Sequence, residues 1–483
     1  MRIQLRWCGS VCLAFAVALV AQAPATVEER IAAVQANLLE YATLAGEAAA
    51  GMHLDRRMVD LHVPAVSIAV IRDGRLDWAR AYGATAIGGS PVTTETLFSA
   101  ESMSKPVTAL AVLKLVEERK IDLDIDVNRY LKWWKIPEND FTAQKEVTIR
   151  ELLNHTSGIG THNGELYDPA KRLPTLIETL DGEAPARTAP VCVETMPGSK
   201  FQYSNNGYLV LQLLIEDVTG ESFPEFVRKT VLDPVGMTRS SYDVPLSDAL
   251  SRLSATSYLG SRSIPPRKYY NPNFAAGGLW STPTDLARLL IELQREYAGT
   301  SHKVLHQTTA RMMMEPGPEF RPGSYQGLGI SLNGRRGNMY MEHGGSGVFQ
   351  DEMVAYLHGD GLVIMTSGSN GAAIADEVLR STSKVYGWPD YKQVQRSAIP
   401  LAPEERGKYV GTFGFIKIAS SADGLTGEIP IGSCPQRIYR DTPDHFFILS
   451  GPTELIFGQG DNGQMMSVEF VTPMAHTFLK RGK

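Results

Sequence analysis

The amino-acid sequence predicts an α/β fold of the α+β type: an antiparallel sheet flanked by helices with a mostly helical insertion, followed by a small antiparallel β-barrel or sandwich. Two apolar runs on either side of Asp73-Gly74 are typical of a β-hairpin near the start of the chain. Apolar runs broken by glycine-rich turns return between Gly327 and Ser369, after a long region of helical patterns. We therefore expect the sheet to receive strands from both ends of its domain.

The first 25 residues have the pattern of a secretory signal peptide. Met1 to Arg6 contains two arginines, Trp7 to Val20 is mostly apolar, and Ala21 to Ala25 supplies small residues. The apolar run is shorter than the roughly 20 residues that cross a bilayer. We expect an exported protein, periplasmic or secreted, with no stable membrane span after signal removal. The mature chain is expected to divide into a main domain over 26–398 and a small C-terminal β-domain over 399–483.

Periodicity and turn signals predict the remaining elements. Helices are expected over 27–51, 106–116, 208–218, 284–296 and 373–385. Strands are expected over 66–71, 76–82, 328–332, 339–341, 353–357 and 362–366, and again in short segments after Pro400. The helix over 106–116 is apolar on most sides, so we expect it to be buried centrally.

Composition excludes several classes of function. Hydrophobic residues make up 43% of the chain and charged residues 21%, as in an ordinary globular protein. The formal net charge of -6 gives no basic surplus, so we expect no nucleic-acid partner. The histidines and cysteines show no HExxH, HxH or CxxC spacing, so no metal and no other cofactor are expected. Cys8 and Cys12 leave with the signal peptide, whereas Cys192 and Cys434 either form a disulfide or remain free thiols.

The segment Ser102-Met103-Ser104-Lys105 opens the apolar helix and is the first candidate for catalysis. A three-residue offset puts Ser102 and Lys105 on one helix face. A buried lysine whose pKa is lowered can accept the serine proton, and the helix N-terminus favours developing negative charge. Ser381 and Lys384 repeat the SxxK pattern late in a predicted helix, so the four residues alone are not specific. Their context favours Ser102.

Two further segments could complete a site. Tyr203-Ser204-Asn205 lies in a loop before a helix, where Tyr203 could relay protons and Asn205 could hold Lys105 or a substrate amide. A second YxN match at Tyr269 to Asn271 makes this pattern weak alone. The other segment is the run from 343 to 346, His-Gly-Gly-Ser.

The glycines of this run would let a substrate backbone approach, and His343 could donate a hydrogen bond to the substrate. The backbone amide of Ser346, after Gly345, could hold an oxyanion together with the amide of Ser102.

In combination, the order and spacing of SxxK, YxN and HGG resemble the serine β-lactamase and penicillin-binding-protein superfamily, in the branch of class C β-lactamases, serine D-peptidases and esterases. Three other phrases, at 152–158, 233–237 and 277–286, are similar to that branch, and the resemblance covers about residues 60 to 385. It implies that Ser102 is acylated, that Lys105 is its base, that Tyr203 relays the proton and that Asn205 orients Lys105 and substrate. It assigns His155, Thr156 and Gly158 to a structural turn, and the terminal domain resembles a lipocalin-like β-domain found in some relatives.

The resemblance implies a serine hydrolase that cleaves an ester or amide bond in a small-molecule or peptide substrate, and the signal-peptide pattern adds that it is exported. His343 stands where many members have the lysine of a Lys-Thr-Gly motif. A mostly neutral histidine is a weaker anchor for the carboxylate of a penicillin, so esterase or peptidase activity is favoured over β-lactamase activity. The alternatives are β-lactamase or D-Ala-D-Ala carboxypeptidase activity, or a penicillin-binding sensor that does not turn over. The sequence makes no prediction of oligomeric state.

Overall fold

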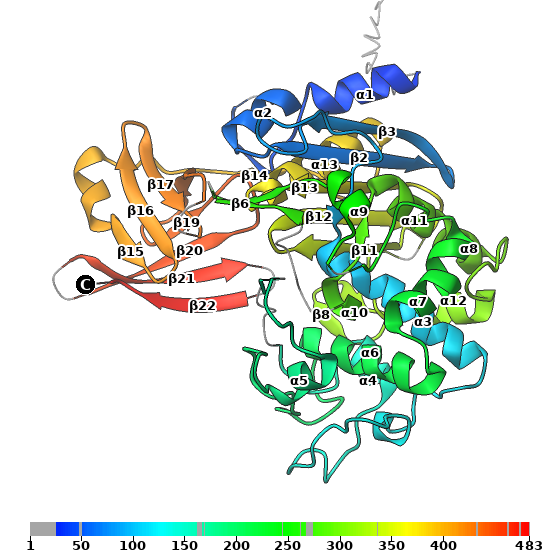
Figure 1. Ribbon diagram of the computed structural model, residues 1–483. Helices are drawn as coiled ribbons and strands as arrows, with labels where there is room; N and C mark the ends of the chain where they lie inside the picture. Colours follow the sequence, from blue (N-terminus) through cyan, green and yellow to red (C-terminus); the bar gives the residue numbers. More distant parts are fainter. Residues whose placement is uncertain are drawn as a thin grey trace, which may run out of the picture.

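The computed structural model describes residues 26–47, 51–161, 167–168, 170–243, 245–260, 262–266, 274–335, 337–430, 433–460, 463–472 and 475–482. The expected signal peptide over 1–25 and the segment from Tyr269 to Asn271 lie outside the described residues. Two bodies are visible in Figure 1, a larger one and a smaller body of strands coloured orange to red.

The larger body is formed around an eight-stranded antiparallel sheet in the order β3-β2-β13-β12-β11-β10-β9-β8. Its strands are β2 (Ala65–Arg72), β3 (Arg75–Gly83), β8 (Glu319–Arg321), β9 (Ser324–Gln326), β10 (Ser331–Asn333), β11 (Tyr340–Ser346), β12 (Phe349–Tyr356) and β13 (Gly361–Ser367). Strand β2 pairs directly with β13, nearly 300 residues later in the chain, with Val66 opposite Thr366. The expectation that the sheet receives strands from both ends of the domain is confirmed.

Helices cover both faces of this sheet. One face carries α1 (Val27–Gln35), α2 (Leu54–Asp60) and α13 (Gly371–Tyr386), and the other carries α3 (Ser104–Glu117), α6 (Asn205–Thr219) and α11 (Pro283–Ala298). Strand β2 is buried on both sides: Val66, Ile68 and Val70 face the first group, whereas Ala65 and Ala69 face the second. Figure 1 shows α1 and α2 above the sheet and α3 and α6 below it.

The helical insertion carries shorter elements between long connections. They are β4 (Phe98–Ser99), α4 (Ile149–Leu153), α5 (Leu176–Asp181), α7 (Phe223–Val227), α8 (Asp233–Val235), α9 (Asp248–Arg252), β5 (Ser257–Leu259), β6 (Arg262–Ile264), α10 (Phe274–Gly277), β7 (Trp280–Ser281) and α12 (Gln307–Met313). The short 3-10 helix η1 (Glu101–Met103) leads directly into α3. Helix α3 is buried along most of its length, as expected from its apolar sequence.

Some expected boundaries are wrong. The helix expected over 27–51 ends at Gln35, because Leu38 forms a bridge with Met52 and β1 (Ala42–Leu44) pairs in parallel with β14 (Val394–Arg396). The strand expected over 328–332 begins only at Ser331. The strand expected over 339–341 instead continues to Ser346, so the His-Gly-Gly-Ser run lies within β11 rather than beside a strand.

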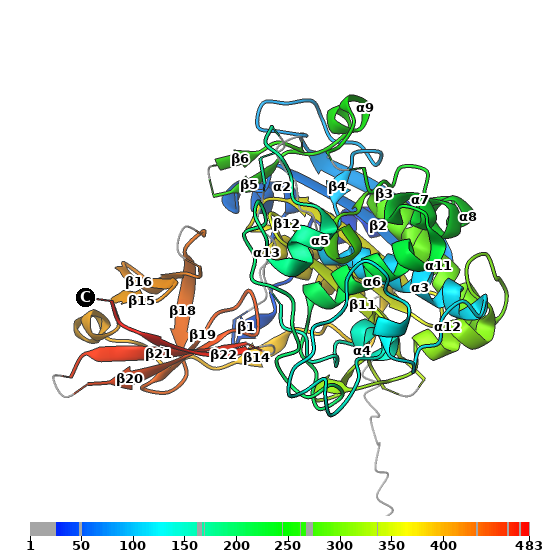
Figure 2. The same ribbon diagram turned by 60° about the horizontal axis from the view of Figure 1, so that its bottom comes forward.

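The smaller body is a nearly closed antiparallel barrel in the order β15 to β22. Its strands are β15 (Gly411–Phe413), β16 (Ile416–Ser421), β17 (Gly424–Glu428), β18 (Gln436–Arg440), β19 (His445–Phe447), β20 (Glu454–Gln459), β21 (Met465–Thr472) and β22 (Ala475–Lys480). A bridge between Phe413 and Arg481 brings the first and last strands together. Figure 2 shows the barrel beside the end of the larger body where β1 and β14 lie.

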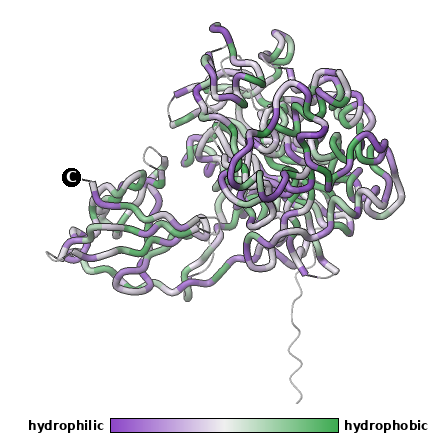
Figure 3. Tube along the Cα trace, turned by 90° about the horizontal axis from the view of Figure 1, so that it is seen from below, coloured by the Kyte–Doolittle hydropathy of each residue, from purple (hydrophilic) through white to green (hydrophobic). Residues whose placement is uncertain are grey.

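Aromatic and aliphatic side chains fill the inside of the barrel. The Phe446 ring lies 4.8 Å from Tyr409 and 5.2 Å from Phe457 between centroids, and Ile416, Leu455 and other residues complete the cluster. In Figure 3, hydrophobic and hydrophilic residues interchange along its strands, as expected for a sheet with one buried face. We propose that the chain divides near residue 399, because this cluster is separate from the two clusters of the larger body.

Arg396, at the end of β14, binds the barrel through its side chain. Its guanidinium pairs with Asp441 and Glu454, each at 2.9 Å, and lies 4.3 Å from the centroid of the Phe447 ring. A backbone hydrogen bond from Ala42 to the Leu449 carbonyl adds a contact from β1. Of the described residues, no helix combines the length and apolarity that a bilayer crossing requires.

The filled barrel yields a stability prediction. Replacing Phe446 by alanine removes a fully buried ring and should lower the free energy of unfolding of the barrel by about 3–5 kcal/mol. Phe478→Ala is the matched control, because that ring on β22 is 65% exposed, and it should change the value by less than about 0.5 kcal/mol. Urea unfolding followed by circular dichroism measures both. Equal effects of the two substitutions would contradict a packed barrel interior.

Candidate active site

The amine of Lys105 lies at the centre of the candidate site. Lys105 is in the first turn of α3, and its side chain is fully buried by the packing of this helix within the core. Burial lowers the pKa of Lys105 to about 7, because removal from water disfavours the charged form, and the carboxylate of Glu101 only partly offsets this. A large fraction of the amine is therefore neutral near pH 7.

Three oxygen atoms from different elements surround this amine. The Lys105 Nζ lies 3.0 Å from Ser102 Oγ, 2.8 Å from Asn205 Oδ1 and 2.9 Å from the carbonyl oxygen of Ala276 in α10. A neutral amine has two hydrogens and one lone pair. Because the amide and carbonyl oxygens only accept, they take both hydrogens, and the lone pair is left for the hydroxyl of Ser102 to donate to. This is the arrangement that a serine nucleophile and its base require.

Helix α10 is held against α3 by hydrogen bonds that fix the Ala276 carbonyl. Thr108 donates its hydroxyl to the Ala275 carbonyl at 2.7 Å, and the Leu279 amide donates to Ser104 Oγ at 3.0 Å. The Ser104 hydroxyl in turn donates to the Glu101 carbonyl at 2.7 Å. Sequence reasoning missed the role of Ala276, because a backbone acceptor leaves no signal in the residue type.

Tyr203 lies beside both Ser102 and Lys105. Burial raises the pKa of its phenol well above the usual value, although a hydrogen bond with Ser102 opposes the shift, so the phenol is protonated and can donate to Ser102 Oγ. The Lys105 Nζ lies 4.7 Å from the centroid of the Tyr203 ring. Ser204 caps α6 by accepting the Gly207 amide at 2.9 Å, which places Asn205 at the first helical position.

His343 lies on β11 and is buried. Burial is the main cause that lowers the pKa of His343 to about 3, with a smaller contribution from the charge of Lys105, so the imidazole is neutral at pH 7. Its Nδ1 lies 2.8 Å from the Gly344 carbonyl, which can only accept, so the proton is on Nδ1. The other nitrogen, Nε2, is then an acceptor. The donor role expected from the sequence does not fit this tautomer.

Gly345 allows β11 to pass close to the residues before Ser102. A Cβ atom at Gly345 would lie 2.6 Å from the Ala100 carbonyl oxygen, nearer than any side chain can approach. Strand β11 therefore packs against η1, which contains Ser102, and Ser346 ends the strand with an exposed side chain. Glu101 adopts a left-handed backbone conformation with φ of 47° immediately before Ser102.

The second SxxK segment lies elsewhere. Ser381 is buried within α13 and donates its hydroxyl to the Glu377 carbonyl at 2.7 Å and to the Asn37 carbonyl at 2.9 Å. These contacts are those of a helix-packing serine rather than a nucleophile. Cys192 and Cys434 are both free thiols. Within the described part of the chain, no group of three or more His, Cys, Asp or Glu residues is arranged to hold a metal ion.

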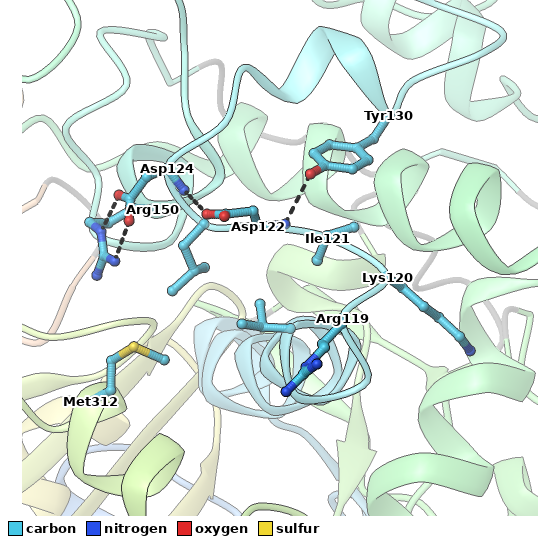
Figure 4. A pocket seen from close by; sticks show the side chains of 10 residues that line it. Arg119, Lys120, Ile121, Asp122, Asp124, Tyr130, Arg150 and Met312 are labelled. Carbon is cyan, nitrogen blue, oxygen red and sulfur yellow. Dashed lines mark hydrogen bonds and ion pairs between the residues drawn. The ribbon is translucent and has the colours of Figure 1, made fainter.

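Figure 4 shows a pocket of about 390 Å³ that lies near the other end of α3. Two contacts join residues that line it: Arg150 pairs with Asp124 at 2.7 Å, and the Asp122 amide donates to the Tyr130 hydroxyl at 3.0 Å. No residue of the Ser102 site lines it. We therefore place the chemistry at the start of α3 and not in this pocket.

The fold and the side chains around Lys105 define the class of β-lactamase-fold serine hydrolases, and comparisons with known proteins agree. The family model described as Beta-lactamase matches residues 50–381, and the chain belongs to this family. The fold is similar to that of an octameric penicillin-binding protein homologue from Pyrococcus abyssi, with a TM-score of 0.60 and 24% identity over 88% of this chain and 98% of that one.

Two relatives from Staphylococcus aureus are similar in sequence. Protein flp of strain N315 is 27% identical over 231 residues, which are 46% of this chain and 42% of that protein. Teichoic acid D-alanine hydrolase is 26% identical over 263 residues, which are 54% of this chain and 60% of that protein. The matched regions thus span less than two thirds of the length of either relative.

The buried amine gives a prediction for pH dependence. Below its pKa near 7, Lys105 is protonated and cannot accept the Ser102 proton, so kcat/KM should fall about tenfold per pH unit on the acid side. His343 does not titrate in this range, because its pKa is lowered to about 3. The hydrolysis rate of p-nitrophenyl butyrate against pH measures the profile. A rate that stays constant from about pH 5 to about pH 8 would contradict a Lys105 base.

Proposed function

We propose that this protein is an exported hydrolase that cleaves an ester or amide bond through an acyl-enzyme on Ser102. The single observation that carries the proposal is the contact of the Lys105 amine with Ser102 Oγ, Asn205 Oδ1 and the Ala276 carbonyl. Export is proposed from the signal-peptide pattern of residues 1–25, and the relative named teichoic acid D-alanine hydrolase supports it.

The first half-reaction forms the acyl-enzyme. Ser102 Oγ attacks the carbonyl carbon as its proton passes to Lys105 Nζ, and the backbone amides of Ser102 and Ser346 stabilise the oxyanion. The tetrahedral intermediate then collapses, the bond to the leaving group breaks, and the proton passes from Lys105 through the Tyr203 hydroxyl to the leaving oxygen or nitrogen.

The second half-reaction consumes one water molecule. Water attacks the acyl carbon and loses a proton to a basic group of the site. The bond between the acyl carbon and Ser102 Oγ then breaks, the acid product departs, and Ser102 Oγ takes up a proton. The proposal gives Ser102, Lys105 and Tyr203 the roles that the sequence predicts for them. Gly345 and Ser346 would act through the close approach of β11 to η1.

The neutral tautomer of His343 favours one substrate class. A penicillin or a peptide with a free carboxylate needs a cation or a hydrogen-bond donor at this position, whereas Nε2 of His343 only accepts. A substrate group that donates, such as the ammonium of an aminoacyl ester, fits an acceptor. Together with the relative named teichoic acid D-alanine hydrolase, this supports a D-alanyl ester or a similar aminoacyl ester as the substrate class.

The test of the nucleophile is p-nitrophenyl butyrate hydrolysis by purified mature protein. Ser102→Ala should lower kcat at least about 10³-fold, because the acyl-enzyme cannot form. Ser381→Ala is the matched control, since Ser381 has the same SxxK pattern but lies within α13, and it should retain the wild-type rate. Activity that persists in Ser102→Ala would contradict the proposal, as would a wild-type protein that turns over neither this ester nor D-alanine methyl ester.

The acceptor role of His343 gives a separate prediction. His343→Lys should raise acylation by benzylpenicillin at least about 10-fold, because the new ammonium can pair with the penicillin carboxylate. The same substitution should lower turnover of D-alanine methyl ester, whose ammonium would meet a like charge. Stopped-flow acylation and ester hydrolysis measure the two effects. A variant that gains nothing with the penicillin and loses nothing with the ester would contradict the assignment.

A further inference from the structure

The turn from Tyr203 to Asn205 must position two side chains accurately. In the proposed reaction, Tyr203 must reach Ser102 while Asn205 holds one hydrogen of the Lys105 amine. Tyr203 lies in no helix or strand, and only Asn205 belongs to α6. Something outside the turn must therefore fix it, since a displacement of about 1 Å can cost about 100-fold in rate.

His155 contacts this turn from its buried side. Its Nδ1 accepts the Ser204 amide at 3.1 Å, and its carbonyl accepts the Gln202 amide at 2.8 Å. Its ring lies 4.5 Å from the Tyr203 ring and 5.3 Å from the Tyr208 ring between centroids. His155 is only 1% exposed and has a left-handed backbone with φ of 61°, so both its ring and its carbonyl reach the turn.

The hydrogen bond fixes the state of the His155 ring. Because Nδ1 accepts from an amide, the proton must be on Nε2, which is buried and has no hydrogen-bond partner among the described residues. Burial is the main cause that lowers the pKa of His155 well below its usual value, and the charge of Lys105 adds to the shift. The ring is therefore a neutral acceptor that adds no charge near Lys105.

Thr161 contacts the same turn from its exposed side. Its Oγ1 donates to the Tyr203 carbonyl at 2.7 Å and accepts the Asn205 amide at 3.0 Å. Next to it, the Gly160 carbonyl accepts the Ser204 hydroxyl at 3.2 Å. Hydrogen bonds from the segment 155–161 thus reach every residue of the turn, and they do so from two sides.

We propose that His155 and Thr161 are positioning residues that together hold the Tyr203–Asn205 turn in register with Lys105 and Ser102. This assignment rests on the proposed function and extends it, because neither residue contacts Ser102 or Lys105 by a hydrogen bond in the structure. The family resemblance of the sequence implies that His155 belongs to a structural turn outside the site. Through its contacts with Ser204 and Tyr203, the turn that contains His155 would position the side chains of the proposed active site.

Three substitutions at His155 separate the two contacts of its ring. His155→Asn keeps an acceptor, because Asn Oδ1 is the same number of bonds from Cα as His Nδ1, and asparagine tolerates a positive φ. His155→Phe keeps the ring but leaves the Ser204 amide unpaired, and His155→Leu removes both contacts. We expect Phe and Leu to lower kcat on p-nitrophenyl butyrate about 100-fold with little change in KM, and Asn to restore kcat to within about 10-fold of wild type.

Substitutions at Thr161 test the contacts on the exposed side of the Tyr203–Asn205 turn. Because Thr161 is exposed, these variants are expected to fold. Thr161→Val has the same shape without the hydroxyl and should lower kcat about 10-fold, whereas Thr161→Ser keeps the hydroxyl and should retain it. The pH profile provides a further readout. Displacement of Asn205 in His155→Phe and Thr161→Val should shift the acid limb that reports Lys105, and a merely structural role would leave that limb in place.

Crystal structures of the same variants test the positioning directly and need no turnover. Tyr203 or Asn205 should move away from Lys105 in His155→Phe and Thr161→Val, and return in His155→Asn and Thr161→Ser. Equal losses of kcat in Asn, Phe and Leu, or unchanged side-chain positions in Phe and Val, would overturn the proposal. If wild type shows no Ser102-dependent turnover, the proposed function fails by itself, and the crystal structures still decide the positioning role.

Discussion

Burial of the Lys105 amine is the constraint on which the rest of the site depends. An ammonium without water is costly, so the chain must either supply acceptors or let the group lose its proton. The fold does both: Asn205 and Ala276 supply two acceptors, and the pKa falls to about 7. The neutral amine has only two hydrogens, which Asn205 and Ala276 accept, so its lone pair is left to accept the proton of the Ser102 hydroxyl. Burial thus both removes the charge of Lys105 and makes its amine a base.

Segments that are far apart in the chain surround the Lys105 amine. The apolar helix α3 keeps water away, α10 and α6 present the acceptors, and β11 approaches η1 so closely that only a glycine fits at 345. The antiparallel sheet makes this approach possible, because β11 is held by β12 in a continuous register from Tyr340 to Ser346. The terminal barrel contributes none of these contacts. Its interior is filled by its own aromatic and aliphatic side chains.

The sequence predicted what depends on short spacing or strong turn signals. The hairpin at Asp73-Gly74, the buried helix α3 and the class of fold are confirmed, and the Lys105 amine lies within hydrogen-bond distance of both Ser102 and Asn205. What it could not predict depends on partners far away in the chain. The helix expected over 27–51 stops at Gln35 because β1 finds a partner strand some 350 residues later. The acceptor state of His343 follows from a single carbonyl, and the Ala276 contact from a backbone atom, so neither leaves a pattern in the residue types.

The central claim is that Lys105 is neutral enough near pH 7 to act as a base. Titration of the free enzyme, labelled with ε-¹³C lysine and followed by NMR, tests it most directly, because the Lys105 signal can be identified by its loss in Lys105→Ala. The account predicts that this signal titrates with a pKa of about 7, while exposed lysines titrate near their ordinary value of about 10.4. A Lys105 signal that titrates together with the exposed lysines would contradict the account.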